Sequence, residues 1–235
     1  MDLPSYVVPI FAATTALTVL LVRFVSGSRR ALILLCGWIA LQTLIANTGF
    51  YAVTSARPPR FALAIGPPAL LIAALFLTRA GRAFLDRLNL RWLTLLHVVR
   101  LPVELVLHWL FIAGLVPQVM TYEGRNFDIL SGVTAPIVAV IAFRAGAPNR
   151  RLLLAWNVVC LVLLANIVVH GILSVPGPLQ QFGFEQPNVA LLRAPFVWLP
   201  SIIVPVVLLA HLAAIRQLSR ATRADATINH GAVKP

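Results

Sequence analysis

Residues 92–118 read WLTLLHVVRLPVELVLHWLFIAGLVPQ, and this stretch decides the fold class. Its length and its apolar content suit a helix that crosses a lipid bilayer. Its interior nevertheless carries the titratable side chains His97, Arg100, Glu104 and His108. Charged side chains at membrane depth are costly, so they usually face a protein interior, a cavity or a pathway. The stretch therefore predicts a membrane-spanning helix and marks the place where function should be sought.

The rest of the chain repeats this apolar pattern. Of its 235 residues, 60% are apolar and only 11% are charged, and the mean hydropathy is +0.90. An average soluble domain has roughly 25% charged residues, so the composition indicates an integral membrane protein. Lipid leaves helices and closed barrels as the only spanning structures, and the unbroken apolar runs lack the alternation of strands. We predict an all-α, polytopic transmembrane bundle of seven helices in one domain, residues 1–218, followed by a polar cytoplasmic tail, residues 219–235. The predicted spans are 5–26, 32–54, 61–78, 92–118, 128–144, 152–173 and 196–215.

Basic residues predict how the chain is oriented. If the N-terminus lies outside, 14 of the 19 lysines and arginines fall in predicted cytoplasmic segments, and Arg100 alone lies within the membrane. This distribution follows the positive-inside rule. We therefore expect a multi-pass protein of a bacterial inner (plasma) membrane with its C-terminus in the cytoplasm. The same distribution accounts for the net charge of +12, so the expected partner is the lipid bilayer and no nucleic acid. The oligomeric state stays open.

Shared features indicate an internal repeat of two helix triplets. The proposed units are 5–79 and 127–216, joined by the helix over 92–118. The matched features are GSRR at 27–30 with PNRR at 148–151, Asn47 with Asn166, Pro68 with Pro205, and Arg79 with Arg216. The implied plan is three helices, one linker helix and three more helices, in which the two triplets are parallel repeats.

This plan resembles the architecture of SWEET-like sugar transporters, which are built from parallel repeats. The resemblance is architectural only, because Pro9 and Pro136 are out of register where paired prolines of that family would match. A shared architecture does not imply a substrate.

Two short segments resemble a group of uncharacterised bacterial integral membrane proteins. These segments are TYEGRNFDIL at 121–130 and FVWLP at 196–200. The resemblance covers the last two thirds of the chain and implies a membrane location without an activity.

The polar residues of the fourth predicted span lie on one face of a helix. Arg100, Glu104 and His108 stand four apart and, with His97, fall within an arc of roughly 80°. We expect this stripe to face the bundle interior. Arg100 and Glu104 can pair along the helix, and Pro102 predicts a kink that frees a carbonyl near residue 98.

The stripe is open to several interpretations. It could be an ion pair that only fixes packing, or a substrate or proton site in which the protonation of Glu104 responds to a ligand or to pH. The second interpretation predicts a protein that binds or transports a small solute or protons. An embedded enzyme that uses Glu104 and His108 as acid and base is an alternative, although no nucleophile elbow or phosphate-binding loop is present. We predict no catalytic residues and no metal.

Haem is a further alternative, although we predict no cofactor. His97 and His211 lie at similar distances from the predicted cytoplasmic ends of their helices, so they could bracket an iron. The cysteines Cys36 and Cys160 lack metal-site spacing and are expected to behave as small apolar side chains.

A second polar path is predicted toward the outside. Asn126 or Asp128 could cap the fifth predicted helix or contact a ligand. Asn166 and His170 share a helix face, and the last outer loop, 175–194, is long enough to fold over an outer cavity. The residues of this path are Tyr122, Glu123, Arg125, Asn126, Asp128, Asn166 and His170.

Overall fold

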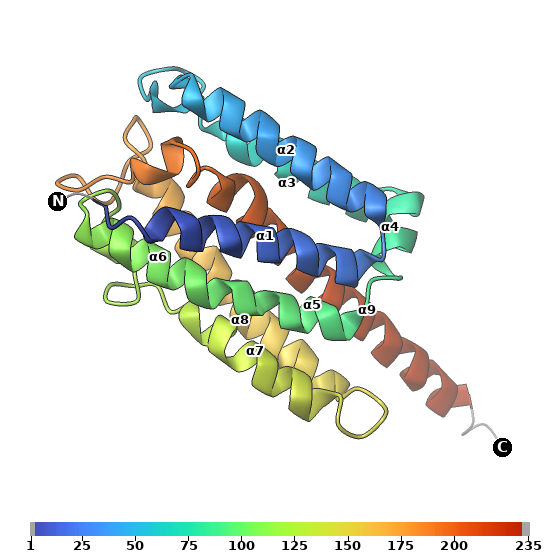
Figure 1. Ribbon diagram of the computed structural model, residues 1–235. Coiled ribbons are helices and arrows are strands. Elements are labelled where there is room, and N and C mark those ends of the chain that lie inside the picture. The colour runs from blue at the N-terminus through green and yellow to red at the C-terminus, as the bar shows by residue number, and fades with distance from the viewer. Residues whose placement is uncertain (1–2, 232–235) are drawn as a thin grey trace.

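The protein is all-helical in the computed structural model, which describes residues 3–231. Its main helices run back and forth between two ends of one bundle (Figure 1). They are α1 Val7–Ser26, α2 Arg29–Asn47, α3 Ala62–Leu77, α4 Arg79–Leu85, α5 Leu90–Leu96, α6 Arg100–Ile112, α7 Ile129–Ala142, α8 Arg150–Leu173 and α9 Val204–Gly231. Short turns complete the order: the 3-10 helices η1 Phe50–Ala52, η2 His97–Val99, η3 Gln118–Met120 and η4 Ala190–Leu192, and the π-helix η5 Leu199–Ile203.

Within the described residues, five helical runs are long and apolar enough to cross a membrane. They are α1, α2, Leu90–Ile112, α8 and Leu199–Arg220. The helices α3 and α4 are bent by 95° at their junction and count as a sixth span if they are taken together, whereas α7 has only 14 residues. Outward-facing leucines such as Leu34, Leu70 and Leu77 expose more than two thirds of their surface, which suits contact with lipid. The all-helical fold and the membrane class are thus as the sequence predicts.

The two ends of the bundle are built from different segments of the chain. One end, called the loop end, holds the start of α1 and the long loops 113–128 and 174–198 (Figure 1). The other, called the arginine end, holds the α1–α2 turn, α4 and the α7–α8 turn, with Arg29, Arg30, Arg79, Arg82, Arg144 and Arg150 in or beside them. The start of α1 and the end of α9 lie at opposite ends of the bundle, and α9 extends beyond the arginine end (Figure 1). The predicted tail at 219–235 thus begins inside α9, and Asp2 and Lys234 lie outside the described residues.

Helix ends explain where the predicted spans and the structure differ. The sequence predicts a fourth span that reaches residue 118, but α6 ends at Ile112 because Gly114 adopts a left-handed φ of 80° and Pro117 follows it. The second predicted span likewise ends at Asn47 instead of residue 54, two residues before Gly49 with φ 73°. The seventh begins at Leu199 and continues past residue 215 to Gly231.

The two proposed repeat units have similar turns but differ in where their matched asparagines lie. Ser28 caps α2 by accepting from Ala31 N–H, and Asn149 caps α8 by accepting from Leu152 N–H, so the two matched turns are built alike. In contrast, Asn47 is the last residue of α2, whereas Asn166 lies inside α8. The repeat therefore stays a prediction.

An ion pair joins the arginine end of α9 to the turn after α4. The Arg216 guanidinium donates to both oxygens of Asp86, at 2.9 and 3.0 Å, and Arg220 also pairs with Asp86. The hydrogen bond from Arg216 lowers the pKa of Asp86 from its ordinary value. Gln217 adds hydrogen bonds to the carbonyls of Leu85 and Leu88. These contacts place α9 against α5 and so position His211 beside the fourth span.

Candidate functional site

The fourth span changes its winding where its polar residues begin. The α-helix α5 passes into the 3-10 turn η2 and then into α6 without leaving the axis of the run Leu90–Ile112. Pro102 has no N–H to donate to the carbonyl four residues earlier, and the 3-10 turn at His97–Val99 lies at that point. In place of the kink predicted from Pro102, the structure thus has a local change of winding within one continuous run.

Arg100 is the most fully paired charge of the buried centre. Its guanidinium binds the Asp128 carboxylate through two contacts, Nε to Oδ2 at 2.6 Å and Nη2 to Oδ1 at 2.5 Å. Both side chains are almost completely buried. The predicted pairing of Arg100 with Glu104 is therefore replaced by an ion pair with Asp128, because two parallel contacts match a guanidinium to a carboxylate.

His211 of α9 extends this pair toward α8. Arg100 Nη1 lies 3.1 Å from His211 Nε2, and His211 Nδ1 lies 2.9 Å from Asn157 Oδ1. A guanidinium can only donate, so His211 Nε2 must accept and Nδ1–H must donate to Asn157. His211 is therefore neutral. Arg100, Asp128, His211 and Asn157, here called the buried tetrad, thus join four parts of the chain.

His97 packs against the tetrad without joining its hydrogen bonds. Its ring is stacked on the His211 ring, with centroids 3.8 Å apart and an interplanar angle of 19°, and Trp156 meets it edge-on. The ring is fully buried, and neither nitrogen has a hydrogen-bond partner among the described residues. Stacked rings leave no space for an iron between them, so this arrangement does not fit two axial haem ligands. The two histidines do meet, as their matched depths predict.

Glu104 binds the loop before α7. Its Oε2 accepts from Asn126 Nδ2 at 2.6 Å, and the same amide donates to the Met120 carbonyl at 3.0 Å. The Asn126 Oδ1 accepts from Asp128 N–H, while the Asp128 side chain makes no capping bond to α7. Asn126 is therefore a link between Glu104 and the loop, and Asp128 an ion-pair partner. The helix-capping interpretation of these side chains is not what the structure contains.

The helix α7 begins deep inside the bundle. Arg100 and Leu101 lie at the middle of the run Leu90–Ile112, and Asp128, directly before α7, binds Arg100. Gly132 lies so close to this level that an added Cβ would come within 2.7 Å of the Leu101 nitrogen. The loop before α7 therefore enters the interior, where Asn126 is fully buried. Figure 1 shows this loop returning from the end of α6 to the middle of the bundle. Irregular backbone at such depth is tolerated where protein covers it, and interrupted helices of this kind form binding sites in transporters.

The remaining predicted residues lie closer to the loop end. His108 stacks on Tyr122, with ring centroids 4.9 Å apart, and its Nδ1 lies 3.6 Å from Glu123 Oε1. No hydrogen bond joins His108 to Glu104 within the described part of the chain: Glu104 binds Asn126, and His108 lies beside Glu123. Asn166 donates to the Arg125 carbonyl at 2.7 Å, and the Asn166 carbonyl lies 2.8 Å from His170 Nδ1. Asn166 of α8 thus supports the loop before α7, whereas His170 contacts its own helix and the Phe182 ring of the loop after α8.

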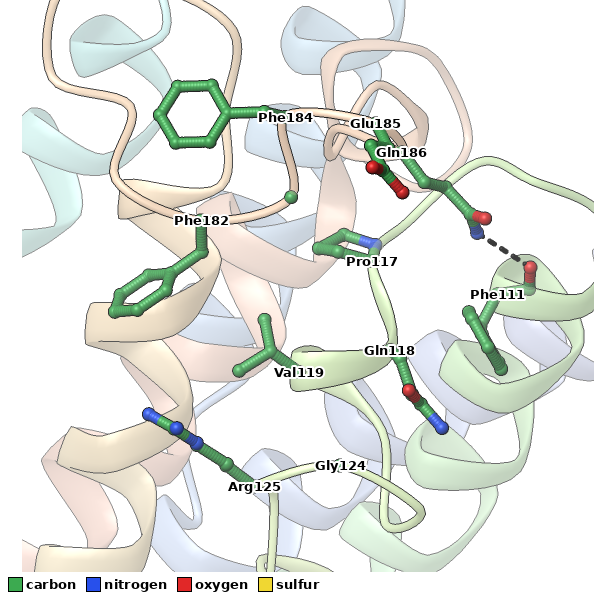
Figure 2. Close-up of a pocket in the computed structure, with 11 residues that line it drawn as sticks. Phe111, Pro117, Gln118, Val119, Gly124, Arg125, Phe182, Phe184, Glu185 and Gln186 are labelled. Atoms are coloured by element: carbon green, nitrogen blue, oxygen red, sulfur yellow. Dashed lines mark hydrogen bonds between the residues drawn. The ribbon is translucent and has the colours of Figure 1, made fainter.

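An open pocket of about 670 Å³ lies at the loop end, beside the loop before α7 (Figure 2). Its walls come from the end of α6, from residues 117–125 and from the loop after α8. The lining residues are Phe111, Pro117, Gln118, Val119, Gly124, Arg125, Phe182, Gly183, Phe184, Glu185 and Gln186. Part of the predicted outer loop 175–194 thus lines a cavity, as its length suggests.

Sequence reasoning missed Asn157 and the partner of Arg100. Asn157 is an amide inside an apolar span, the same signal that singles out Asn166, so it could have been found. The pairing of Asp128 with Arg100 has no local signal, because the two are 28 residues apart. Both cysteines are free thiols, and no group of three or more possible metal ligands is found among the described residues.

The fold and the site together define a helical membrane protein with a buried, ion-paired centre and an open pocket at one end. The chain belongs to the family described as Domain of unknown function (DUF8737), whose model matches residues 58–219. This range includes the buried tetrad, Glu104, Asn126 and the pocket, and it leaves out α1 and α2. No curated protein and no solved structure matches the chain.

Proposed function

We propose that this chain crosses a bacterial inner membrane seven times, with the loop end outside and the arginine end in the cytoplasm. Five long apolar runs, the bent pair α3–α4 and the shorter α7 supply the crossings. Because α7 is too short to cross the membrane alone, the loop before α7 spans the remaining thickness. The clustering of arginines at one end supports the orientation. The start of α1 and the end of α9 lie at opposite ends of the bundle, which agrees with an odd number of crossings (Figure 1).

Reporter fusions test this topology. A periplasmic reporter placed after Asp2 is expected to be active, and a cytoplasmic reporter placed after Ala221 is expected to be active, because the two positions lie on opposite sides of the membrane. A fusion after Arg87, in the turn between α4 and α5, is the matched internal control and should behave like the one after Ala221. Cytoplasmic activity at Asp2 or periplasmic activity at Ala221 would refute the orientation.

We further propose that the protein binds or transports a small solute in a manner linked to a proton at Glu104. The observation that carries this proposal is the bond between Glu104 and Asn126 of the buried loop. Asp128 already neutralises the charge of Arg100 through their ion pair, and Glu104 forms no ion pair within the described residues. The centre thus contains one more carboxyl group than it has cations, and a proton or a cationic solute would balance it.

The surroundings of Glu104 support access from one side only. Polar side chains continue from Glu104 toward the loop end through His108 and Glu123. Toward the arginine end, beyond His97, a cluster of apolar side chains closes the bundle. Its buried members are Val138, Ala142, Leu153 and Leu218. This arrangement suits a site that exchanges protons or solute with the loop end, as one state of an alternating-access protein would.

Glu104→Gln tests the proton link, since the amide preserves the size of the side chain but cannot exchange a proton. We expect the variant to fold and to lose the pH-dependent part of proton uptake after an imposed pH step. The measurement uses the reconstituted protein in vesicles with an entrapped pH-sensitive dye. Asp86→Asn is the matched control, because its lowered pKa keeps Asp86 ionised at neutral and mildly acidic pH. Wild-type uptake in Glu104→Gln would leave Glu104 with a role in packing only.

A further inference from the structure

The pocket at the loop end is lined by two opposite charges that do not meet. Arg125 and Glu185 lie on opposite sides of it (Figure 2). Both side chains are exposed, and neither forms an ion pair with any described residue. A cation and an anion that face one cavity without contact leave room for a molecule with complementary charges at its two ends.

Apolar side chains line the pocket between these charges. Phe182, Val119 and Pro117 line the wall between Arg125 and the rim, where Phe184 has 72% of its surface exposed. Covering such an exposed aromatic side chain with an apolar partner is energetically favourable. The middle of the pocket therefore suits a hydrocarbon or aromatic body.

The walls of the pocket are fixed by hydrogen bonds and close backbone contacts. Gln186 donates to the carbonyls of Phe111, at 2.8 Å, and Val116, at 2.6 Å, which ties the outer loop to the end of α6. Gly183 has φ 66°, and a Cβ there would come within 2.8 Å of the Pro117 side chain. At the floor, a Cβ on Gly124 would come within 2.2 Å of the Gln118 carbonyl oxygen. These contacts hold the walls of the open pocket in place, which suits a preformed binding site.

The floor of the pocket is connected to the buried centre. Arg125 directly precedes Asn126, which binds Glu104, and the Arg125 carbonyl is held by Asn166 of α8. A ligand that draws the Arg125 side chain into the pocket would therefore act on the peptide that positions Asn126. This connection relates occupancy of the pocket to the hydrogen bond of Glu104.

We propose that the pocket binds a small zwitterion with an apolar body, whose carboxylate contacts Arg125 and whose amine contacts Glu185. This inference deepens the proposed function, because it names the class of solute, and it rests on that function for its link to Glu104. Whether the zwitterion binds in the pocket does not depend on the proton link at Glu104. A simple anion or a simple cation would use only one of the two charges.

The test uses ω-amino carboxylates from glycine to aminooctanoate, with alkanoates and alkylamines of the same lengths as probes. Ligand-induced thermal stabilisation and calorimetric affinity are measured on the full chain in detergent. We expect one length range of the amino carboxylates to bind, and to bind more tightly than either singly charged series. Arg125→Gln and Glu185→Gln should each weaken this binding by about 10-fold or more, the effect of losing one charged hydrogen bond.

Two control variants sharpen the result. Arg193→Gln removes another exposed arginine that does not line the pocket, and should leave binding unchanged. The exchange Arg125→Glu with Glu185→Arg should restore binding of the amino carboxylate in reverse orientation. Equal binding of all three probe series, unchanged affinity in Arg125→Gln, or no binding at any length would overturn the proposal.

Glu104→Gln separates this inference from the proposed function. If the variant binds amino carboxylates with wild-type affinity at every pH and also keeps wild-type proton uptake, the pocket is a binding site and the proton link fails. If Glu104→Gln loses proton uptake while no amino carboxylate binds to the wild type, the proton link stands and the zwitterion assignment fails.

Discussion

Arg100→Leu is expected to lower the free energy of unfolding by about 3–5 kcal/mol, the cost of leaving one partner of a buried ion pair without its counter-charge. The substitution removes both contacts to Asp128 and the donor to His211 Nε2. The Asp128 carboxylate would then remain buried with its charge uncompensated, beside a histidine that has lost its acceptor role. Denaturant-induced or thermal unfolding in detergent micelles measures the change.

Two further variants distinguish the ion pair from a general loss of positive charge. Arg144→Leu removes an exposed arginine at the arginine end and should change stability by well under 1 kcal/mol, as most surface substitutions do. Adding Asp128→Leu to Arg100→Leu should recover much of the lost stability, because a buried pair replaced by apolar side chains is often neutral. A loss in Arg100→Leu no larger than that in Arg144→Leu would remove the ion pair from the account of stability.

The fourth span shows what helix periodicity predicts well. The four-residue spacing of Arg100, Glu104 and His108 places them on one face, and in the structure Arg100 and Glu104 are buried while His108 lies at the edge of the interior. The cost of placing charge against lipid is a physical constraint on every sequence, so this inference needs no knowledge of the neighbouring helices. The similar depths of His97 and His211 are likewise set by helix rise, and their rings do meet.

The partners of these residues depend on a feature without a local signal. Helix geometry favours Glu104 as the partner of Arg100, but Asp128 takes that place because the loop before α7 turns inward. Nothing in the apolar run of residues 128–144 shows that its first residue lies level with the middle of the fourth span and not with its end. The start of α7 is fixed by tertiary contacts, namely Asn126 with Glu104 and Gly132 with Leu101. The stacking of His97 on His211 is also a tertiary outcome, which depth alone does not distinguish from metal ligation.

The close approach of α7 to the fourth span leads to the second large expected effect, that of Gly132→Ala. A Cβ at residue 132 would lie 2.7 Å from the Leu101 nitrogen and 3.3 Å from the Arg100 carbonyl carbon. Both atoms belong to the backbone, so they cannot yield as the end of a flexible side chain would. The helix α7 must therefore move away from the fourth span, and Asp128 would move with it. We expect the free energy of unfolding to fall by about 1–3 kcal/mol, the usual cost of overpacking a tight interface.

Gly37→Ala is the matched control for this substitution, because Gly37 also lies inside a helix but has no heavy atom within 4 Å of an added Cβ. There the change should be neutral or slightly stabilising, since alanine favours the helix more than glycine by about 1 kcal/mol. Unfolding of both variants in the same detergent gives the comparison.

The position of Gly132 also separates two causes of instability. If displacement of Asp128 contributes, Gly132→Ala should destabilise the wild type more than it destabilises the Arg100→Leu, Asp128→Leu double variant, in which no ion pair remains to be disturbed. Equal losses in the two backgrounds would assign the whole effect to helix packing, and equal stability of Gly132→Ala and Gly37→Ala would contradict the close approach itself.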